Sequence, residues 1–171
     1  MEFYRPTLLD PGKHQRDRFA SGEPSLDEWL RRYAGQNRRG NTAAVWVIAD
    51  RDYKVVCYAT LSMASVDRSA SPGPLAKGAP MQVPALLVGR RGTDVGASGI
   101  GLGTQMVKHI LATAAELNLK AACRAVVVTA LNATAFRWWQ RFGFDPLDAD
   151  DATNLDLYLL TKDMDATLAR L

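Results

Sequence analysis

Cysteine and histidine are scarce in this sequence of 171 residues, which contains two of each. Cys57 and Cys123 lie within apolar runs and are predicted to be buried free thiols, so no disulfide framework is expected. His14 and His109 are too few and too far apart in the sequence to suggest zinc ligation. The sequence therefore predicts no metal site.

Long hydrophobic runs are also missing. No stretch reaches the roughly 18 apolar residues that a membrane span requires. The amino-terminal segment MEFYRPTLLD carries charges early and has no apolar core of a signal peptide. We therefore expect a cytoplasmic protein with no membrane segment. With 47% apolar and 23% charged residues, the composition is globular, and residues 1–171 are predicted to form a single domain.

Negative charge is scarce in most of the chain. The net charge is +3, but seven acidic residues follow from Asp145 onward against only Lys162 and Arg170. The first 144 residues therefore hold 19 basic and 11 acidic residues, a surplus of 8. Such a surplus suits an anionic ligand or partner, although an ordinary solvated surface explains it equally well.

Hydrophobic periodicity predicts alternating strands and helices. The first helix is predicted at residues 25–40, with Ser25 and Glu28 as a capping box and Gly40 at its end. Two further helices are expected at residues 104–118 and 132–143. Apolar runs predict strands at residues 43–50, 54–66, 84–91, 124–131 and 154–164, with an irregular loop at 67–84. The pattern indicates an α/β or α+β protein.

A glycine-rich segment, GASGIGLG at residues 96–103, precedes the second helix. It lacks the lysine of a nucleotide-binding P-loop, because Thr104 and Gln105 follow Gly103, and its glycine spacing differs from that of a dinucleotide-binding turn. Glycines nevertheless let backbone N–H groups converge, and a helix amino terminus favours an anion. The segment is either an anion site, for a diphosphate or similar group, or simply a tight connection.

Three motifs in the carboxyl-terminal half resemble the GNAT acetyltransferase superfamily. They are the segment Ser98–Gly103, the strand RAVVVTAL, and the run from Asn132 through Trp139 to Gly143-Phe144, which is similar to the family pattern Asn-x-x-Ala-x-x-x-Tyr with a Gly-Phe ending. The segments FASGEPSLDEWLRRYAGQN and VVCYATLSMASV look like the branch that acts as toxins of type II toxin–antitoxin systems, the TacT-like enzymes. The similarity extends from about Phe19 to Met164.

The resemblance implies a GNAT fold, with a central mixed sheet of about six strands flanked by helices. It implies acetyl-CoA as co-substrate and acetyl transfer to the α-amino group of an aminoacyl-tRNA, which blocks translation. It also implies a ribbon-helix-helix antitoxin as partner and a homodimer. Two alternatives stay open: a GNAT enzyme for another small amine or a protein N-terminus, and a catalytically weak domain that binds CoA or an antitoxin.

The resemblance also assigns site residues. In this superfamily the strand before the loop holds the thioester and pantetheine through backbone groups, and the loop holds the pyrophosphate. Asn132 is assigned to the pantetheine, although a plain helix N-cap explains it as well. The residues expected to bind acetyl-CoA are Arg91, Gly92, Thr93, Ser98, Gly99, Ile100, Gly101, Leu102, Gly103, Thr104 and Asn132.

Trp139 stands where the family has a tyrosine thought to protonate the departing thiolate. An indole N–H donates hydrogen bonds but is no useful acid, and losing a general acid costs roughly 10²–10⁴-fold in rate. A thiolate with a pKa near ~8.5 can leave unaided. Three interpretations remain: a slow site, another phenol such as Tyr58 or Tyr158, or no acetyl transfer. Trp139 is also readily explained as a core aromatic residue.

The pKa of an amine indicates which kind of amine can accept the acetyl group. An α-amino group with a pKa of ~7.7–8.0 is partly neutral at cytosolic pH, whereas a lysine at ~10.4 needs a base. No Glu or His is evident as that base, which favours an α-amine. Exposed arginines are common, but phosphate contacts to tRNA are possible for Arg16, Arg18, Arg31, Arg32, Arg38, Arg39, Arg137 and Arg141.

Overall fold

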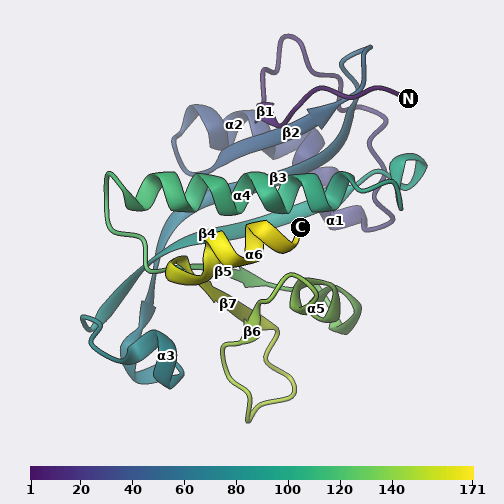
Figure 1. The fold of residues 1–171 in the computed structure, drawn as a ribbon. Coiled ribbons are helices and arrows are strands. Elements are labelled where there is room, and N and C mark those ends of the chain that lie inside the picture. The colour runs from purple at the N-terminus through teal and green to yellow at the C-terminus, as the bar shows by residue number, and fades with distance from the viewer. The chain divides into compact units, whose positions relative to one another are not determined.

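A computed structural model describes residues 1–171, which cluster into two compact units. Unit 1 comprises residues 1–62 and 89–109, and unit 2 comprises residues 63–88 and 110–171. Three elements run through both units: strand β3 (Val55–Asp67), strand β4 (Gln82–Thr93) and helix α4 (Leu102–Asn118). Figure 1 shows the order of the elements along the chain.

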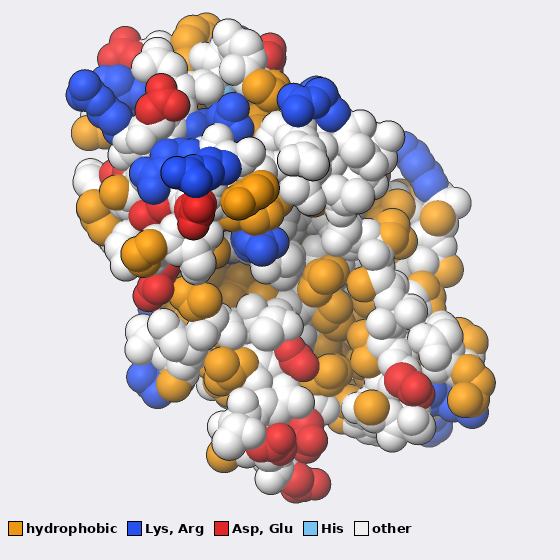
Figure 2. All heavy atoms as spheres, turned by 180° about the vertical axis from the view of Figure 1, so that it is seen from behind, with side chains coloured by type: hydrophobic (Ala, Val, Ile, Leu, Met, Phe, Trp, Pro, Cys, Tyr) orange, Lys and Arg blue, Asp and Glu red, His pale blue; other side chains and the backbone are white.

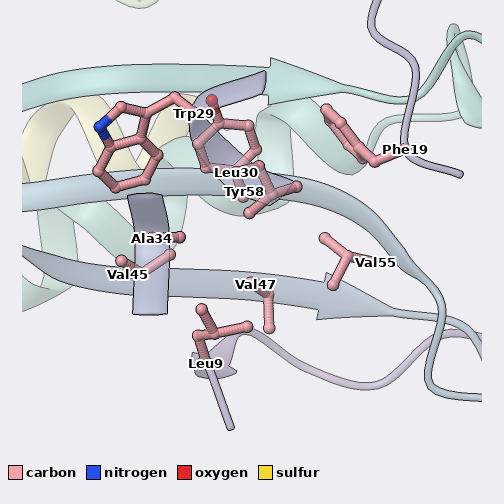
Figure 3. Close-up of a cluster of buried hydrophobic side chains, with 9 residues drawn as sticks. All are labelled: Leu9, Phe19, Trp29, Leu30, Ala34, Val45, Val47, Val55 and Tyr58. Atoms are coloured by element: carbon pink, nitrogen blue, oxygen red, sulfur yellow. The ribbon is translucent and has the colours of Figure 1, made fainter. Parts of the chain in front are cut away.

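Unit 1 combines antiparallel strands with a helical segment. Strand β1 (Thr7–Leu8) pairs with β2 (Ala44–Ala49), and β2 pairs with β3, both antiparallel. The helical segment consists of α1 (Pro24–Glu28), a π-helical turn (Trp29–Tyr33) and α2 (Ala34–Arg39). Trp29, Leu30 and Ala34 of this segment are buried and Leu26 is half-buried, whereas Tyr33 and the four arginines are exposed. Figure 3 shows the resulting core: Leu9, Phe19, Trp29, Leu30, Ala34, Val45, Val47, Val55 and Tyr58.

Unit 2 is built on strands β5 (Ala125–Thr129), β6 (Asp145–Pro146) and β7 (Asp156–Leu160). Strand β7 pairs antiparallel with both β5 and β6. Three short helices accompany them: α3 (Gly73–Ala76), α5 (Ala133–Gln140) and α6 (Met164–Arg170). An apolar core forms from Leu75, Ala79, Val83, Ala85, Ala125, Val127, Tyr158 and Leu160.

The strands form one mixed sheet in the order β1-β2-β3-β4-β5-β7-β6. Strands β4 and β5 pair parallel, and helix α4 connects them, as a parallel crossover requires. The predicted fold class, a mixed sheet with flanking helices, is confirmed. The sheet has seven strands rather than about six because β1 and β6, with two residues each, are too short to leave a periodic signal.

The predicted start of the first helix and the predicted end of the last strand are wrong. Ser25 does not cap the first helix, because Pro24 already occupies the first helical turn and the N-cap is Glu23 without a side-chain bond. Asp27 is buried and instead accepts hydrogen bonds from the backbone N–H and hydroxyl of Ser21, at 2.8 and 2.6 Å. The last strand ends at Leu160, and a 3₁₀ turn (Thr161–Asp163) leading into α6 follows where the strand was expected to continue to residue 164.

Cys57 and Cys123 are both buried free thiols, as predicted. Burial raises the pKa of each thiol, which disfavours the reactive thiolate. None of the helices is long and apolar enough to span a membrane.

Candidate functional site

Strand β4 extends beyond its pairing with β5. The two strands pair only from Ala85 to Val88 on β4, whereas β4 continues to Thr93. Residues 89–93 therefore have an edge without a β5 partner. An edge without a neighbouring strand is a place where backbone groups can bind a ligand.

Two backbone N–H groups point to this edge. The N–H of Arg90 donates to the Thr60 hydroxyl at 2.9 Å, and that of Asp94 donates to the Val56 carbonyl at 2.8 Å, so both face β3. Because successive N–H groups along a strand alternate between its two edges, those of Arg91 and Thr93 face away from β3. Two of the residues predicted to hold the thioester thus present their N–H groups at the open edge.

Gly92, the third residue predicted there, has a different role. Its N–H faces β3 by the same alternation. A Cβ at this position would lie 3.3 Å from Tyr58 Cε1 and 3.5 Å from Phe19 Cζ. Glycine at position 92 therefore lets two core aromatic rings approach β4 closely.

The side chain of Arg91 is hydrogen-bonded to a neighbouring side chain of β4. Its Nη2 donates to the Thr93 hydroxyl at 2.9 Å, and that hydroxyl contacts the Cys57 sulfur at 3.5 Å. Burial lowers the pKa of the Arg91 guanidinium. The Arg91 side chain is thus part of a packed polar cluster, and the backbone N–H of this residue faces the edge of β4 opposite β3.

Asp94 fixes the turn that follows β4. One carboxylate oxygen accepts the N–H of Gly96 at 2.8 Å and caps the 3₁₀ turn Val95–Ala97, while the other accepts the N–H of Ala20 at 2.9 Å. Sequence reasoning missed this role, although the pattern Asp-x-Gly after a strand is a signal for such an Asx turn.

The glycine-rich segment has left-handed backbone at two positions. Gly99 has φ +76° and Gly101 has φ +90°, a region that side chains rarely adopt. A Cβ at either position would meet no atom within 4 Å. Backbone conformation, rather than lack of space, thus explains these two glycines.

The segment leads directly into the amino terminus of α4. The N–H of Gln105 donates to the Gly101 carbonyl at 3.0 Å and closes the first helical turn. The N–H groups of Leu102, Gly103 and Thr104 come before this bond and so lack partners within the helix. No acidic residue lies in this turn. The predicted residues from Ser98 to Thr104 are thus brought together where the helix dipole favours an anion.

Asn132 lies in unit 2 and caps a helix. Its side-chain oxygen accepts the N–H of Ala135 at 2.9 Å, at the start of α5. The N-cap interpretation is confirmed. A contact with pantetheine stays a prediction.

Trp139, also in unit 2, is only 3% exposed. Its ring packs edge-on against Trp138 and Phe144, with ring centroids 5.1 Å apart in each case. The side chain is therefore a core aromatic residue, which is the simpler of the two interpretations of this position.

The two alternative phenols are also buried. The Tyr58 hydroxyl donates to the Leu26 carbonyl at 2.8 Å, and burial raises its pKa far above the ordinary value. Tyr158 is 5% exposed in the core of unit 2, and burial, with Asp145, raises its pKa as well. Both are weaker acids than a free phenol, so neither is suited to protonate a thiolate.

No family model matches the chain. The chain is 32% identical over 150 residues to the tRNA-acetylating toxin of Mycobacterium tuberculosis, an alignment that covers 88% of each protein. The chain belongs to the family of tRNA-acetylating toxins.

Solved structures agree on the fold of this toxin. AtaT complexed with acetyl-methionyl-tRNAfMet superposes with a TM-score of 0.87 at 22% identity, covering 96% of this chain and 98% of AtaT. A tyrosine-to-phenylalanine variant of AtaT, bound to the C-terminus of the antitoxin AtaR and to acetyl-CoA, gives a TM-score of 0.82 at 22% identity and 97% coverage of both chains. The toxin shares the fold of these proteins.

Proposed function

We propose that this toxin transfers the acetyl group of acetyl-CoA to the α-amino group of an aminoacyl-tRNA and thereby blocks translation. The observation that carries the proposal is the 32% identity, over 88% of both chains, to a tRNA-acetylating toxin. The fold of AtaT, which was solved with acetyl-methionyl-tRNAfMet and with acetyl-CoA, supports it.

The residues of unit 1 fit acetyl-CoA. The N–H groups at Ser98–Thr104 and the positive end of α4 bind the pyrophosphate. The N–H groups of Arg91 and Thr93 hold the thioester at the open edge of β4, where they stabilise the negative charge that develops on the carbonyl oxygen. None of these contacts needs a particular side chain, which explains how the motif tolerates Ser98 and Ile100.

The chemistry needs little further help from side chains. The amine nitrogen bonds to the thioester carbon, the carbon–sulfur bond breaks, and the nitrogen releases its proton to solvent. An α-amine with a pKa of ~7.7–8.0 is partly neutral near pH 7.5, and a thiol of pKa ~8.5 leaves as the thiolate. With Trp139, Tyr58 and Tyr158 all buried, the reaction proceeds without a proton from any of these three residues.

Protein partners follow from the same family. AtaT was solved with the C-terminus of its antitoxin AtaR, which supports an antitoxin as partner of this toxin. The proposal includes an antitoxin of the ribbon-helix-helix type and a homodimer. It also includes a cytoplasmic location, because aminoacyl-tRNA and acetyl-CoA meet in the cytoplasm.

The test is a rate comparison with labelled acetyl-CoA. Aminoacyl-tRNA is compared with the same tRNA deacylated, with free amino acids and with peptides that have a free N-terminus. The proposal predicts label on aminoacyl-tRNA alone. Faster labelling of amino acids or peptides would favour the small-amine or N-terminal alternative. Acetyl-CoA binding without any transfer would favour the catalytically weak domain.

A further inference from the structure

Arg90 lies next to the proposed thioester site but faces the other side of the sheet. Successive side chains of a strand point to opposite faces, so Arg90 points away from the cluster of Arg91 and Thr93. Its guanidinium carbon lies 4.8 Å from the ring centroid of Trp29. Arg90 is exposed.

The platform beneath Arg90 is rigid. Trp29 is 8% exposed and stacks on Tyr58 with an interplanar angle of 5° and a centroid distance of 6.1 Å. The Tyr58 hydroxyl is itself anchored to the Leu26 carbonyl at 2.8 Å. Figure 3 shows Trp29 and Tyr58 within the core of unit 1. A cation–π contact on such a fixed ring restricts the guanidinium while leaving its N–H groups free to bind.

Several other arginines of unit 1 already have partners. Arg16 donates to the Leu30 carbonyl at 3.0 Å, Arg31 donates to the Phe19 carbonyl at 3.2 Å, and Arg32 lies 3.4 Å from the Glu28 carboxylate. Arg90 has no carboxylate partner within ion-pair distance and no side-chain hydrogen bond, so its charge is available to an anion.

The charge of unit 1 suits a polyanion. Unit 1 holds 13 Lys and Arg against 9 Asp and Glu, whereas unit 2 holds 8 against 9. Figure 2 shows several Lys and Arg side chains exposed on one face of the molecule. Such a field attracts RNA over long range.

We propose that Arg90 binds a backbone phosphate of the tRNA acceptor end and so positions the aminoacyl group at the open edge of β4. This role, which rests on the acetyl transfer proposed above, follows from adjacency: the N–H of Arg91 serves the thioester, and Arg90 is the preceding residue. The guanidinium fork matches a phosphate group. The acetyl-CoA diphosphate already has the N–H groups of the glycine-rich segment, which leaves Arg90 for the RNA.

The test compares Arg90→Gln with Arg5→Gln, which removes the same charge from an exposed arginine of unit 1 that makes no ion pair or side-chain hydrogen bond. Initial rates give the KM for aminoacyl-tRNA and for acetyl-CoA separately. We expect Arg90→Gln to raise the KM for aminoacyl-tRNA about tenfold or more and to leave the KM for acetyl-CoA unchanged. Binding of deacylated tRNA should lose about one unit of its salt slope. Arg5→Gln should change each value less than about twofold.

Arg90→Lys guards against a folding defect, because lysine retains both the charge and a contact with Trp29. We expect it to fold with an unchanged thermal midpoint and to raise the KM for aminoacyl-tRNA about threefold, since it lacks the planar fork. If Arg90→Gln changes the KM values and the salt slope no more than Arg5→Gln does, the role of Arg90 is overturned. A rise in the KM for acetyl-CoA instead would also overturn it and would assign Arg90 to CoA. Absence of transfer by the unmodified toxin would overturn the acetyl-transfer function, while the deacylated-tRNA binding would still decide on Arg90.

Discussion

The carboxylate of Asp94 accepts the backbone N–H of Ala20 at 2.9 Å, across 74 positions of the sequence. The same carboxylate accepts the N–H of Gly96 at 2.8 Å. One side chain thus ties the end of β4, and the turn that precedes the glycine-rich segment, to the residues before α1.

Replacing Asp94 should loosen the acetyl-CoA site. Asp94→Asn retains one oxygen for the Asx turn but loses the second acceptor, so the N–H of Ala20 is left without its partner. We expect the KM for acetyl-CoA to rise about fivefold to tenfold, consistent with the loss of one charge-assisted hydrogen bond. Steady-state kinetics at saturating aminoacyl-tRNA measures this change. An unchanged KM would show that Asp94 does not organise the site.

A methyl group at Gly101 should impair the same site through backbone strain. With φ +90° at Gly101, Gly101→Ala costs about 1–2 kcal/mol in the present conformation. We expect weaker acetyl-CoA binding by calorimetry, by about tenfold. Gly73→Ala is the matched control, because a Cβ there also meets open space but the backbone is not left-handed. Equal effects of both substitutions would exclude backbone strain as the cause.

Tyr58 should be a structural residue rather than an acid. Tyr58→Phe removes the hydroxyl bond to the Leu26 carbonyl, which still accepts the backbone N–H of Trp29, and we expect a loss of about 0.5–1.5 kcal/mol in the free energy of unfolding. Turnover at saturating substrates should stay within about threefold. Urea denaturation and kcat measure the two effects. A drop in kcat of a hundredfold in a folded variant would identify Tyr58 as the general acid.

Restoring the family tyrosine should not restore a large rate. Because Trp139 is buried against Trp138 and Phe144, Trp139→Tyr places a phenol within the core of unit 2. We expect reduced thermal stability and a kcat within about threefold of the starting value. A kcat gain of 10²-fold or more would mean that position 139 reaches the departing thiolate.

Stability should fall in mild acid because of the histidines. Burial lowers the pKa of His14 and of His109, so the folded protein takes up these protons at lower pH than the unfolded chain, whose histidines titrate near ~6.5. The free energy of unfolding should therefore be constant above about pH 7 and decrease below about pH 6.5, by at most about 1.4 kcal/mol per pH unit for each histidine.

Urea denaturation between pH 7.5 and 5.0 checks this dependence, and His14→Gln should reduce the slope. The carboxyl groups of Asp67 and Asp151, whose pKa values are lowered by hydrogen bonds from Ser69 and Thr153, act at lower pH and do not contribute in this window. Constant stability down to pH 5.0 would contradict the assignment.

Much of unit 1 can be predicted from the sequence, because the patterns that indicate its elements lie within short segments. Apolar spacing locates the helical segment that carries Trp29, and the glycine pattern locates Gly99 and Gly101. The partner of Asp94 is not readable, because Ala20 is distant in the chain and contributes only a backbone N–H. The same holds for Arg90 on Trp29, a contact that depends on packing a helix against the sheet.

In unit 2, the sequence does not show which aromatic side chains are buried. The motif around Asn132 and Trp139 is recognisable, but its burial is not. Whether the Trp139 indole faces a ligand or a core depends on how α5 packs, and the structure places it against Phe144. Short elements such as β1 and β6 have too few residues to show any period.

The most direct measurement is the chemical identity of the product. The toxin is incubated with a mixture of aminoacyl-tRNAs and acetyl-CoA, the ester bonds are hydrolysed with mild base, and the released amino acids are analysed by mass spectrometry. The account predicts N-acetyl amino acids that appear only when toxin, acetyl-CoA and charged tRNA are all present. Unacetylated amino acids alone, from a toxin that binds acetyl-CoA, would contradict it.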